Sequence, residues 1–192
     1  MNDGSMRHTA SRGGAWLLAL ALFGGCNGNS VNGSVAGVDM VAEDGFYTEL
    51  EWNGTSYFVV VLTDVEDACN VFRATEPDPG NDYNVLQLWI TGTDPDSYSV
   101  YASSHLDEAV ASGDPYGTAW YLSVINAKEV VNTDGVAGLI DVANFDYDDK
   151  VLAGSMDVIF SGNGNRLQGS FGVDYCELDW ARVAAVLLEG GY

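Results

Sequence analysis

The chain has 192 residues, of which 28 are acidic and 7 are basic, so its formal net charge at pH 7 is −21. So acidic a surface repels nucleic acid and anionic lipid headgroups, which excludes a nucleic-acid-binding role. The same surface would attract a cation or a basic partner. The length favours one domain that is large enough to bury a full hydrophobic core.

The N-terminal stretch has the three parts of an export signal. Arg7 and Arg12 supply positive charge, residues 15–23 form an apolar run, and residues 24–26 read Gly-Gly-Cys. An export signal needs a charged start, an apolar core of roughly 7–15 residues and small residues at its cleavage site. The apolar run is too short for a transmembrane helix, which takes about 20 residues.

This pattern resembles the signal peptide of bacterial lipoproteins, although Phe23 stands where that family usually has Leu. The resemblance implies a signal peptide over residues 1–25, cleavage before Cys26 and acylation of Cys26. Because more than one acyl chain anchors a protein stably in a lipid bilayer, the resemblance also implies that the protein's partner is a membrane. Asn27 follows the cysteine, and by the same resemblance it favours the outer membrane of the cell envelope. An ordinary secreted protein, or a cytosolic protein with a buried N-terminal helix, is the alternative.

Cleavage would change both the charge and the count of free thiols. It removes Asp3, Arg7 and Arg12, and so leaves 27 acidic residues, 5 basic residues and a net charge of −22. We interpret this charge as a solvating coat, with a cation or polycation site as the alternative. With Cys26 acylated, Cys69 and Cys176 remain, which is enough for one disulfide. Two unpaired buried thiols are the other possibility.

The first part of the mature chain predicts a tether followed by a hairpin. Residues 26–34 are rich in Gly, Asn and Ser and predict a flexible tether, so the domain spans 35–192. A short strand is expected near 34–41. Asn53-Gly54 lies between two β-rich runs and predicts a hairpin with Trp52 opposite Thr55. Residues 57–62 are apolar on both faces, which predicts a central strand covered on both sides.

The middle of the chain alternates short helices with strands. A helix is predicted over 64–74, with Thr63 and Glu66 as a capping box and Cys69 on its inner face. A strand follows over 83–91, then a shorter one over 97–102, and one or two helical turns over 104–113 that place His105 on the surface. A further strand is predicted over 136–144. Four residues form another stripe expected to face inward: Thr118, Trp120, Leu122 and Val124.

The last part of the chain predicts a second hairpin and a closing helix. With Asn163-Gly164 at the turn, Phe160 lies opposite Leu167, and the apolar residues of both strands share one face. Residues 169–176 resemble the hairpins of envelope lipoproteins without an assigned function. Residues 180–187 carry apolar residues at helical spacing, which predicts the closing helix.

Recognisable catalytic motifs are absent from the sequence. It has no Gly-x-Ser-x-Gly, no phosphate-binding loop and no Cys-x-x-Cys, and His105 is its only histidine after residue 25. Asp146, Asp148 and Asp149 form an acidic cluster whose oxygens suit Ca²⁺, but a charged hairpin tip needs no metal. We therefore expect no cofactor and no metal. If a metal ion did bind, these three aspartates would be the candidate ligands.

Taken together, these patterns predict an all-β, single-domain antiparallel sandwich of eight or nine strands with two or three short helices. A closed β-barrel around a ligand is the alternative fold. The expected function is that of a non-catalytic, lipid-anchored binding or structural module in the bacterial cell envelope. A carbohydrate- or lipid-binding module that uses its aromatic side chains is one alternative. A hydrolase with two carboxylates is another.

Overall fold

The computed structural model describes residues 28–52, 54–74, 77–92 and 94–179. These residues are mostly β, which confirms the predicted class, and the strands join in one ten-stranded sheet. The strands are β1 Ser30–Val35, β2 Val38–Asp39, β3 Asp44–Trp52, β4 Thr55–Thr63, β5 Tyr83–Ile90, β6 Ser97–Val100, β7 Tyr116–Ile125, β8 Lys128–Asp146, β9 Val151–Phe160 and β10 Arg166–Tyr175. The described helices are α1 Ala68–Arg73, the 3₁₀ turn η1 Ser103–His105 and α2 Leu106–Ser112.

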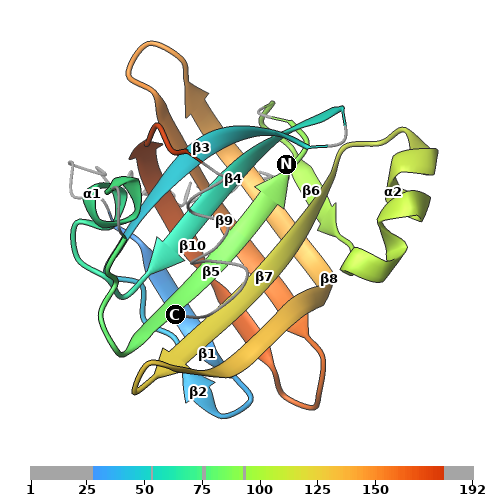
Figure 1. Cartoon of the computed structure of the whole chain (residues 1–192). Helices are drawn as coiled ribbons and strands as arrows, with labels where there is room; N and C mark the ends of the chain where they lie inside the picture. The colour runs from blue at the N-terminus through green and yellow to red at the C-terminus, as the bar shows by residue number, and fades with distance from the viewer. Residues whose placement is uncertain (1–27, 53, 75–76, 93, 180–192) are drawn as a thin grey trace, which may run out of the picture.

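The strands form two layers that cross each other, as Figure 1 shows. The front layer contains β3, β4, β5 and β7, which pair antiparallel in that order. The rear layer contains β8, β9, β10 and β1, which are also antiparallel neighbours. This arrangement confirms the predicted sandwich. It is not purely antiparallel, however, because β6 pairs in parallel with β7 and β10 pairs in parallel with β3.

Backbone pairing connects the two layers at both sides. On one side β8 pairs with β7 as far as Asp134 and then continues beside β9 from Gly135. A register shift after Gly135 and the positive φ of Gly138 mark the bend in β8, since bulges and glycines let a strand change direction. On the other side only two residues of β10 pair with β3, with Tyr175 opposite Tyr47.

The space between the layers is filled by apolar side chains. Leu62, Leu86 and Leu88 of the front layer belong to the same buried cluster as Val158 and Leu167 of the rear layer. The predicted core face of β5, with Leu86, Leu88 and Ile90, is confirmed. The closed-barrel alternative placed a ligand in this space. The pairings do close the sheet at both sides, but packed apolar side chains occupy the space between the layers.

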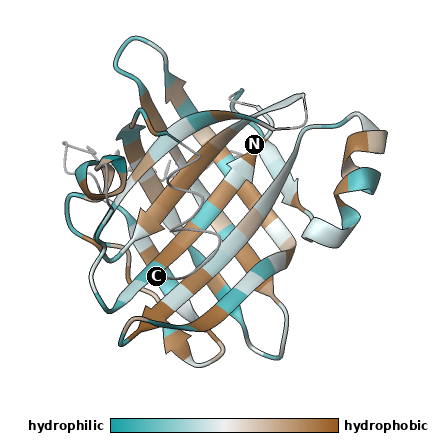
Figure 2. Cartoon of the chain, viewed as in Figure 1, coloured by the Kyte–Doolittle hydropathy of each residue, from teal (hydrophilic) through white to brown (hydrophobic). Residues whose placement is uncertain are grey.

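A second apolar cluster lies on the outer face of the front layer, which we call the front face. It contains Val59 and Val61 of β4, Leu122 of β7 and Phe72 of α1, all of them buried. Figure 2 shows apolar residues along the strands of this layer. Because β4 has apolar side chains in both clusters, the prediction of a central strand covered on both sides is confirmed.

The two predicted hairpins have different outcomes. The β3–β4 hairpin has the predicted register, with Trp52 opposite Thr55. The β9–β10 hairpin has the predicted faces but a register shifted by two residues, so that Leu167 lies opposite Val158 instead of Phe160. The reason is a longer turn, which is closed by a hydrogen bond from the Phe160 N–H to the Asn165 carbonyl. A shift of two residues leaves every side chain on its own face.

The first helix is shorter than predicted and is capped differently. Thr63 and Glu66 do not form a capping box, because the Thr63 hydroxyl donates to the Asn84 carbonyl. The Ala68 N–H at the start of α1 donates instead to Oδ2 of Asp44, at 2.8 Å. This contact attaches the helix to β3, which lies far from it in sequence.

Two predictions concern the ends of the chain. The tether predicted over 26–34 is wrong for residues 30–34, because they belong to β1, which pairs with β10, and because Val31 is buried in the core. The burial of Val31 therefore outweighed the polar composition of residues 26–34. The closing helix predicted over 180–187 lies outside the described residues, as do the signal peptide and Cys26. Among the helices that the structure describes, none is long and apolar enough to cross a membrane.

Candidate ligand pocket

The front face contains a pocket of about 350 Å³ whose described lining is mostly apolar. β4, β5 and β7 form its floor, and η1 and α2 supply part of its rim. The described lining residues are Tyr57, Trp89, Ser103, Leu106, Thr118, Ala119 and Trp120. A pocket of this size and character is of the kind that takes a small organic molecule.

Strand alternation and pairing bring the aromatic lining together. Trp89 lies opposite Val59 of β4 and opposite Thr118 of β7. Trp120 pairs with Gln87, which precedes Trp89 by two residues on β5. Side chains two residues apart on a strand share a face, so both indoles belong to the front face. The stripe expected to face inward on β7 therefore faces outward, because Ala119 and Tyr121 point to the core between the layers.

Aromatic contacts hold one wall of the pocket in place. The Tyr57 and Trp89 rings meet edge to face, with their centroids 5.6 Å apart. Tyr57 also packs on Tyr116 at 6.4 Å, and Tyr101 packs on Tyr116 at 6.3 Å. Such contacts favour a fixed geometry of the rings. Trp89 and Trp120 are both partly buried.

Two polar groups of the aromatic wall already have partners in the protein. The Tyr57 and Tyr116 hydroxyls are 2.8 Å apart, and Nε1 of Trp89 donates to Oε1 of Gln87 at 3.1 Å. Burial, with the hydrogen bond to Tyr57, raises the pKa of Tyr116, so its hydroxyl stays neutral at physiological pH. By contrast, Nε1 of Trp120 is buried and has no acceptor. Among the described lining residues, it is the buried side-chain N–H without a partner.

Ser103, at the rim, is bonded to a carboxylate. Its hydroxyl and its backbone N–H donate to Oδ2 of Asp134, at 2.6 and 2.9 Å. Partial burial would raise the pKa of Asp134, but the hydrogen bonds from Ser103 hold this pKa below its usual value. Asp134 is therefore ionised at neutral pH and fixes the start of η1 against β8.

The neighbouring serine and histidine do not complete a catalytic triad with this aspartate. The Ser104 hydroxyl lies 3.0 Å from Nδ1 of His105, and both residues are exposed. Asp134 bonds Ser103 instead of His105, so it does not orient the imidazole as a triad requires. His105 is on the surface, as predicted.

The three candidate metal ligands lie at the β8–β9 turn. Oδ1 of Asp146 accepts the N–H groups of Asp148 and Asp149, each at 3.0 Å, which is the usual role of an aspartate in a turn. Among the residues that the structure describes, no group of three or more His, Cys, Asp or Glu side chains is placed to hold a metal ion.

The predicted disulfide is present and lies beside the front face. Cys69 of α1 and Cys176, just after β10, are bonded, with their Cα atoms 5.8 Å apart. Cys176 is buried in the front cluster, and Leu178 packs against it. The bond ties the helix that covers the front face to the end of the rear layer.

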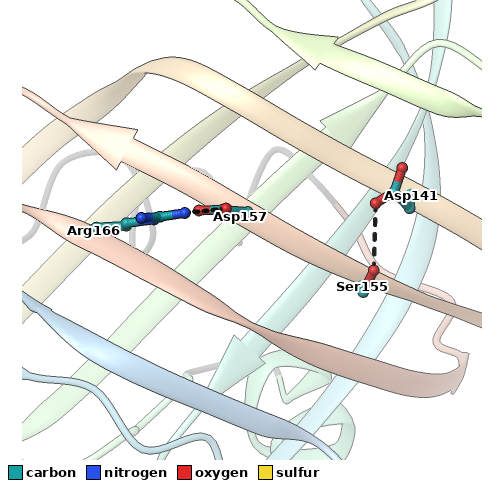
Figure 3. Close-up of polar contacts among 4 residues, drawn as sticks. All are labelled: Asp141, Ser155, Asp157 and Arg166. Atoms are coloured by element: carbon teal, nitrogen blue, oxygen red, sulfur yellow. Dashed lines mark hydrogen bonds and ion pairs between the residues drawn. The ribbon is translucent and has the colours of Figure 1, made fainter.

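The outer face of the rear layer, here the rear face, has a different chemistry. Figure 3 shows the Arg166 guanidinium against the Asp157 carboxylate, and Ser155 bonded to Asp141 on the neighbouring strand. The hydrogen bond and charge of Arg166 lower the pKa of Asp157. Both partners of this ion pair are about half exposed. No pocket with the aromatic lining of the front face is made from these residues.

Comparison with known proteins does not add a family to this geometry. No protein-family model, no curated protein and no solved structure matches the chain. The site therefore has to be judged on its own residues. The sequence indicated aromatic side chains as one possible set of binding groups but did not reveal the pocket, because Trp89 and Trp120 are adjacent only through the pairing of β5 with β7.

Proposed function

We propose that the protein is a non-catalytic binding module, anchored by lipid at Cys26 in the bacterial cell envelope, that holds a small apolar ligand in the front-face pocket. The observation that carries this proposal is the aromatic lining made by Tyr57, Trp89 and Trp120 on adjacent strands. Convergence of rings on a rigid sheet favours ligand binding, because little side-chain freedom is lost when a ligand enters.

The envelope part of the proposal has independent support. The N-terminal pattern is that of a lipoprotein signal, and disulfides persist in oxidising compartments such as the envelope. The Cys69–Cys176 bond is consistent with such a compartment. The outer membrane is favoured by Asn27. The partner expected from these features is the membrane, and the acidic surface leaves a cation or a basic partner as a further expectation.

The carboxylates give no support to a hydrolase. A general acid needs a carboxyl group whose pKa is raised toward the working pH. Asp134 and Asp157 are the described carboxylates with a shifted pKa, and both are shifted downward. The proposal therefore keeps the non-catalytic function.

Binding is tested with N-phenyl-1-naphthylamine, a neutral dye whose fluorescence rises in apolar surroundings. We expect saturable binding that weakens at least tenfold in Trp89→Ala, because an aromatic anchor is lost. Ile159→Ala, which removes an exposed apolar side chain from the rear face, is the matched control and should bind as the original protein does. Equal binding by both variants would place the dye elsewhere and contradict the proposal.

Anchoring is tested separately in bacterial cells supplied with an alkyne analogue of palmitate. The original chain should incorporate the label and fractionate with membranes, whereas Cys26→Ser should do neither. Label retained by Cys26→Ser, or an unlabelled chain in the cytosol, would contradict the envelope assignment without affecting the test of the pocket.

A further inference from the structure

We infer that the ligand of the front-face pocket is an uncharged, flat ring system with few polar groups, and not a sugar or a fatty acid. This inference rests on the proposed function, since it names the class of molecule that the same pocket would hold. It depends on the size of the pocket, on the partners of its polar groups, on its fixed aromatic rings and on the charge around it.

The size of the pocket favours a compact ligand. Its volume of about 350 Å³ is near the lower end of the roughly 300–1,000 Å³ that small-molecule pockets span. An extended acyl chain would leave part of its length in water and would lose rotational freedom along the part that enters. A rigid molecule of one or two fused rings loses no such freedom.

The polar side chains of the lining have few hydrogen bonds to offer a ligand. The Tyr57 hydroxyl is bonded to a second tyrosine, and Nε1 of Trp89 donates to a glutamine. The Ser103 hydroxyl donates to a carboxylate, and Nε1 of Trp120 is buried beyond the reach of a ligand. Thr118 supplies the remaining side-chain hydroxyl of the described lining. A sugar would bring several hydroxyl groups that lose their bonds to water here and gain few in return.

The aromatic rings of the lining are fixed before a ligand enters. Tyr57 meets Trp89 edge to face at 5.6 Å and is held in turn by its contact with Tyr116. Aromatic rings prefer offset-stacked or edge-to-face contacts, which add to the free energy gained from buried apolar area. A flat ring system makes such contacts, whereas a saturated chain gains from the buried area alone.

The charge around the pocket disfavours an ionised ligand. The chain has a net charge of −21, and the described lining contains no basic side chain. A carboxylate that entered would lose its hydration and would face a negative potential. An ammonium group would also lose its hydration, because Asp134 behind the rim already accepts two hydrogen bonds from Ser103. The part of the ligand that contacts the lining is therefore uncharged.

A set of small probes separates these contributions. 2-Naphthol is a flat ring system that is uncharged at pH 7, and 1-octanol is an uncharged chain that also has one hydroxyl group. 2-Naphthoate is a flat anion, and methyl β-glucoside is a ring with several hydroxyl groups. The purified ¹⁵N-labelled protein is titrated with each probe, and its backbone amide resonances are followed by NMR. Amides of β5 and β7 report on the pocket, and those of Gln168 and Ser170 report on the rear face.

We expect 2-naphthol to shift the β5 and β7 amide resonances in a saturable manner and to leave those of the rear face unchanged. It should bind about fivefold more tightly than 1-octanol, because it gains ring contacts at a similar apolar area. It should bind at least tenfold more tightly than 2-naphthoate, because the anion loses its hydration. Methyl β-glucoside should cause no saturable shift.

Two variants test which side chain makes the distinction between ring and chain. Trp89→Leu keeps apolar bulk but removes the ring, so it should weaken 2-naphthol about fivefold and 1-octanol less than about twofold. Thr118→Val, opposite Trp89 on β7, is the matched control. It removes a hydroxyl at nearly constant volume and should change 2-naphthol binding less than about twofold. Unchanged rear-face resonances verify that each variant is folded.

The possible failures are distinguishable. If neither the dye nor any probe binds, the proposed function fails together with the inference. If 1-octanol binds as tightly as 2-naphthol, or if Trp89→Leu weakens both equally, the pocket binds apolar molecules but the inference is overturned. Binding of 2-naphthoate as tight as that of 2-naphthol, or saturable binding of methyl β-glucoside at β5 and β7, also overturns it. So does loss of 2-naphthol binding in Thr118→Val, which would show that a polar contact anchors the ligand.

Discussion

The two outer faces of the sandwich are built by the same strand alternation and yet differ in every property that matters for binding. On the front face Val59, Val61 and Leu122 are fully buried beneath helices and loops. On the rear face Gln168 and Ser170 stand in solvent. A sandwich needs only its inner faces for a core. The apolar residues on the front face therefore pack against the helices and line the pocket, which is why we propose that binding takes place on this side.

The largest expected effect concerns the covalent bond beside the front face. Replacing Cys69 and Cys176 together by Ala should lower the free energy of unfolding by about 4 kcal/mol, because the bond closes a loop of 107 residues in the unfolded chain. Urea unfolding measures the change. Cys26→Ser is the control and should leave stability unchanged. An unchanged midpoint in the double variant would mean that the bond does not constrain the unfolded chain.

Truncating one apolar side chain on each face tests the asymmetry directly. Phe72→Ala in α1 should cost about 3 kcal/mol, since Phe72 is 1% exposed in the front cluster. Ile159→Ala on the rear face should cost less than about 0.5 kcal/mol, since Ile159 is 43% exposed. Thermal and urea unfolding of both variants give the comparison. Similar costs would remove the distinction between the faces.

The bend of β8, which carries the chain from one layer to the other, provides the next test. A Cβ at Gly138 would lie 2.1 Å from the Asp157 carbonyl oxygen, and φ there is +135°. Gly138→Ala should therefore cost more than about 1 kcal/mol. Gly172→Ala on β10 meets no atom within 4 Å and is the control, expected to be close to neutral. Urea unfolding compares the two variants. Equal stability of Gly138→Ala and Gly172→Ala would contradict the claim that the bend of β8 requires a glycine at position 138.

The smallest effects concern the two aspartates with lowered pKa values, one on each side. A carboxyl group with a lowered pKa stabilises the fold above its unfolded pKa, and the contribution is lost as the pH falls through the folded value. Asp134→Asn should thus cost about 1 kcal/mol at pH 7 and progressively less below about pH 4. Asp157→Asn should show the same trend with a smaller amplitude, because its ion pair with Arg166 is exposed to solvent. Unfolding curves at pH 7, 5 and 3 measure the cost of each substitution. A cost that increased at lower pH for Asp134→Asn or Asp157→Asn would contradict the prediction.

Local patterns predicted much of the fold. Asn53-Gly54 specified the register of the first hairpin because a two-residue turn leaves no freedom in pairing. Alternation identified the core side of β5, and cysteine counting identified the disulfide. The second hairpin was predicted with the right faces and the wrong register, since its turn is longer than Asn163-Gly164 alone suggests.

Long-range features were beyond the sequence patterns. Asp44 caps α1 across the fold, and no local signal indicates that. The stripe of Thr118, Trp120 and Leu122 is apolar enough to read as a core face, and only the pairing order shows that it faces the helices instead. The pocket depends on the same pairing, because Trp89 and Trp120 become neighbours only once β5 lies beside β7.

Native mass spectrometry of the protein extracted from bacterial envelopes tests the central claim most directly. The account predicts the mass of residues 26–192 with acyl chains on Cys26, together with a non-covalent small molecule that is lost from Trp89→Ala and kept by Ile159→Ala. An unprocessed 192-residue chain with free thiols and no bound molecule would contradict both the anchor and the pocket.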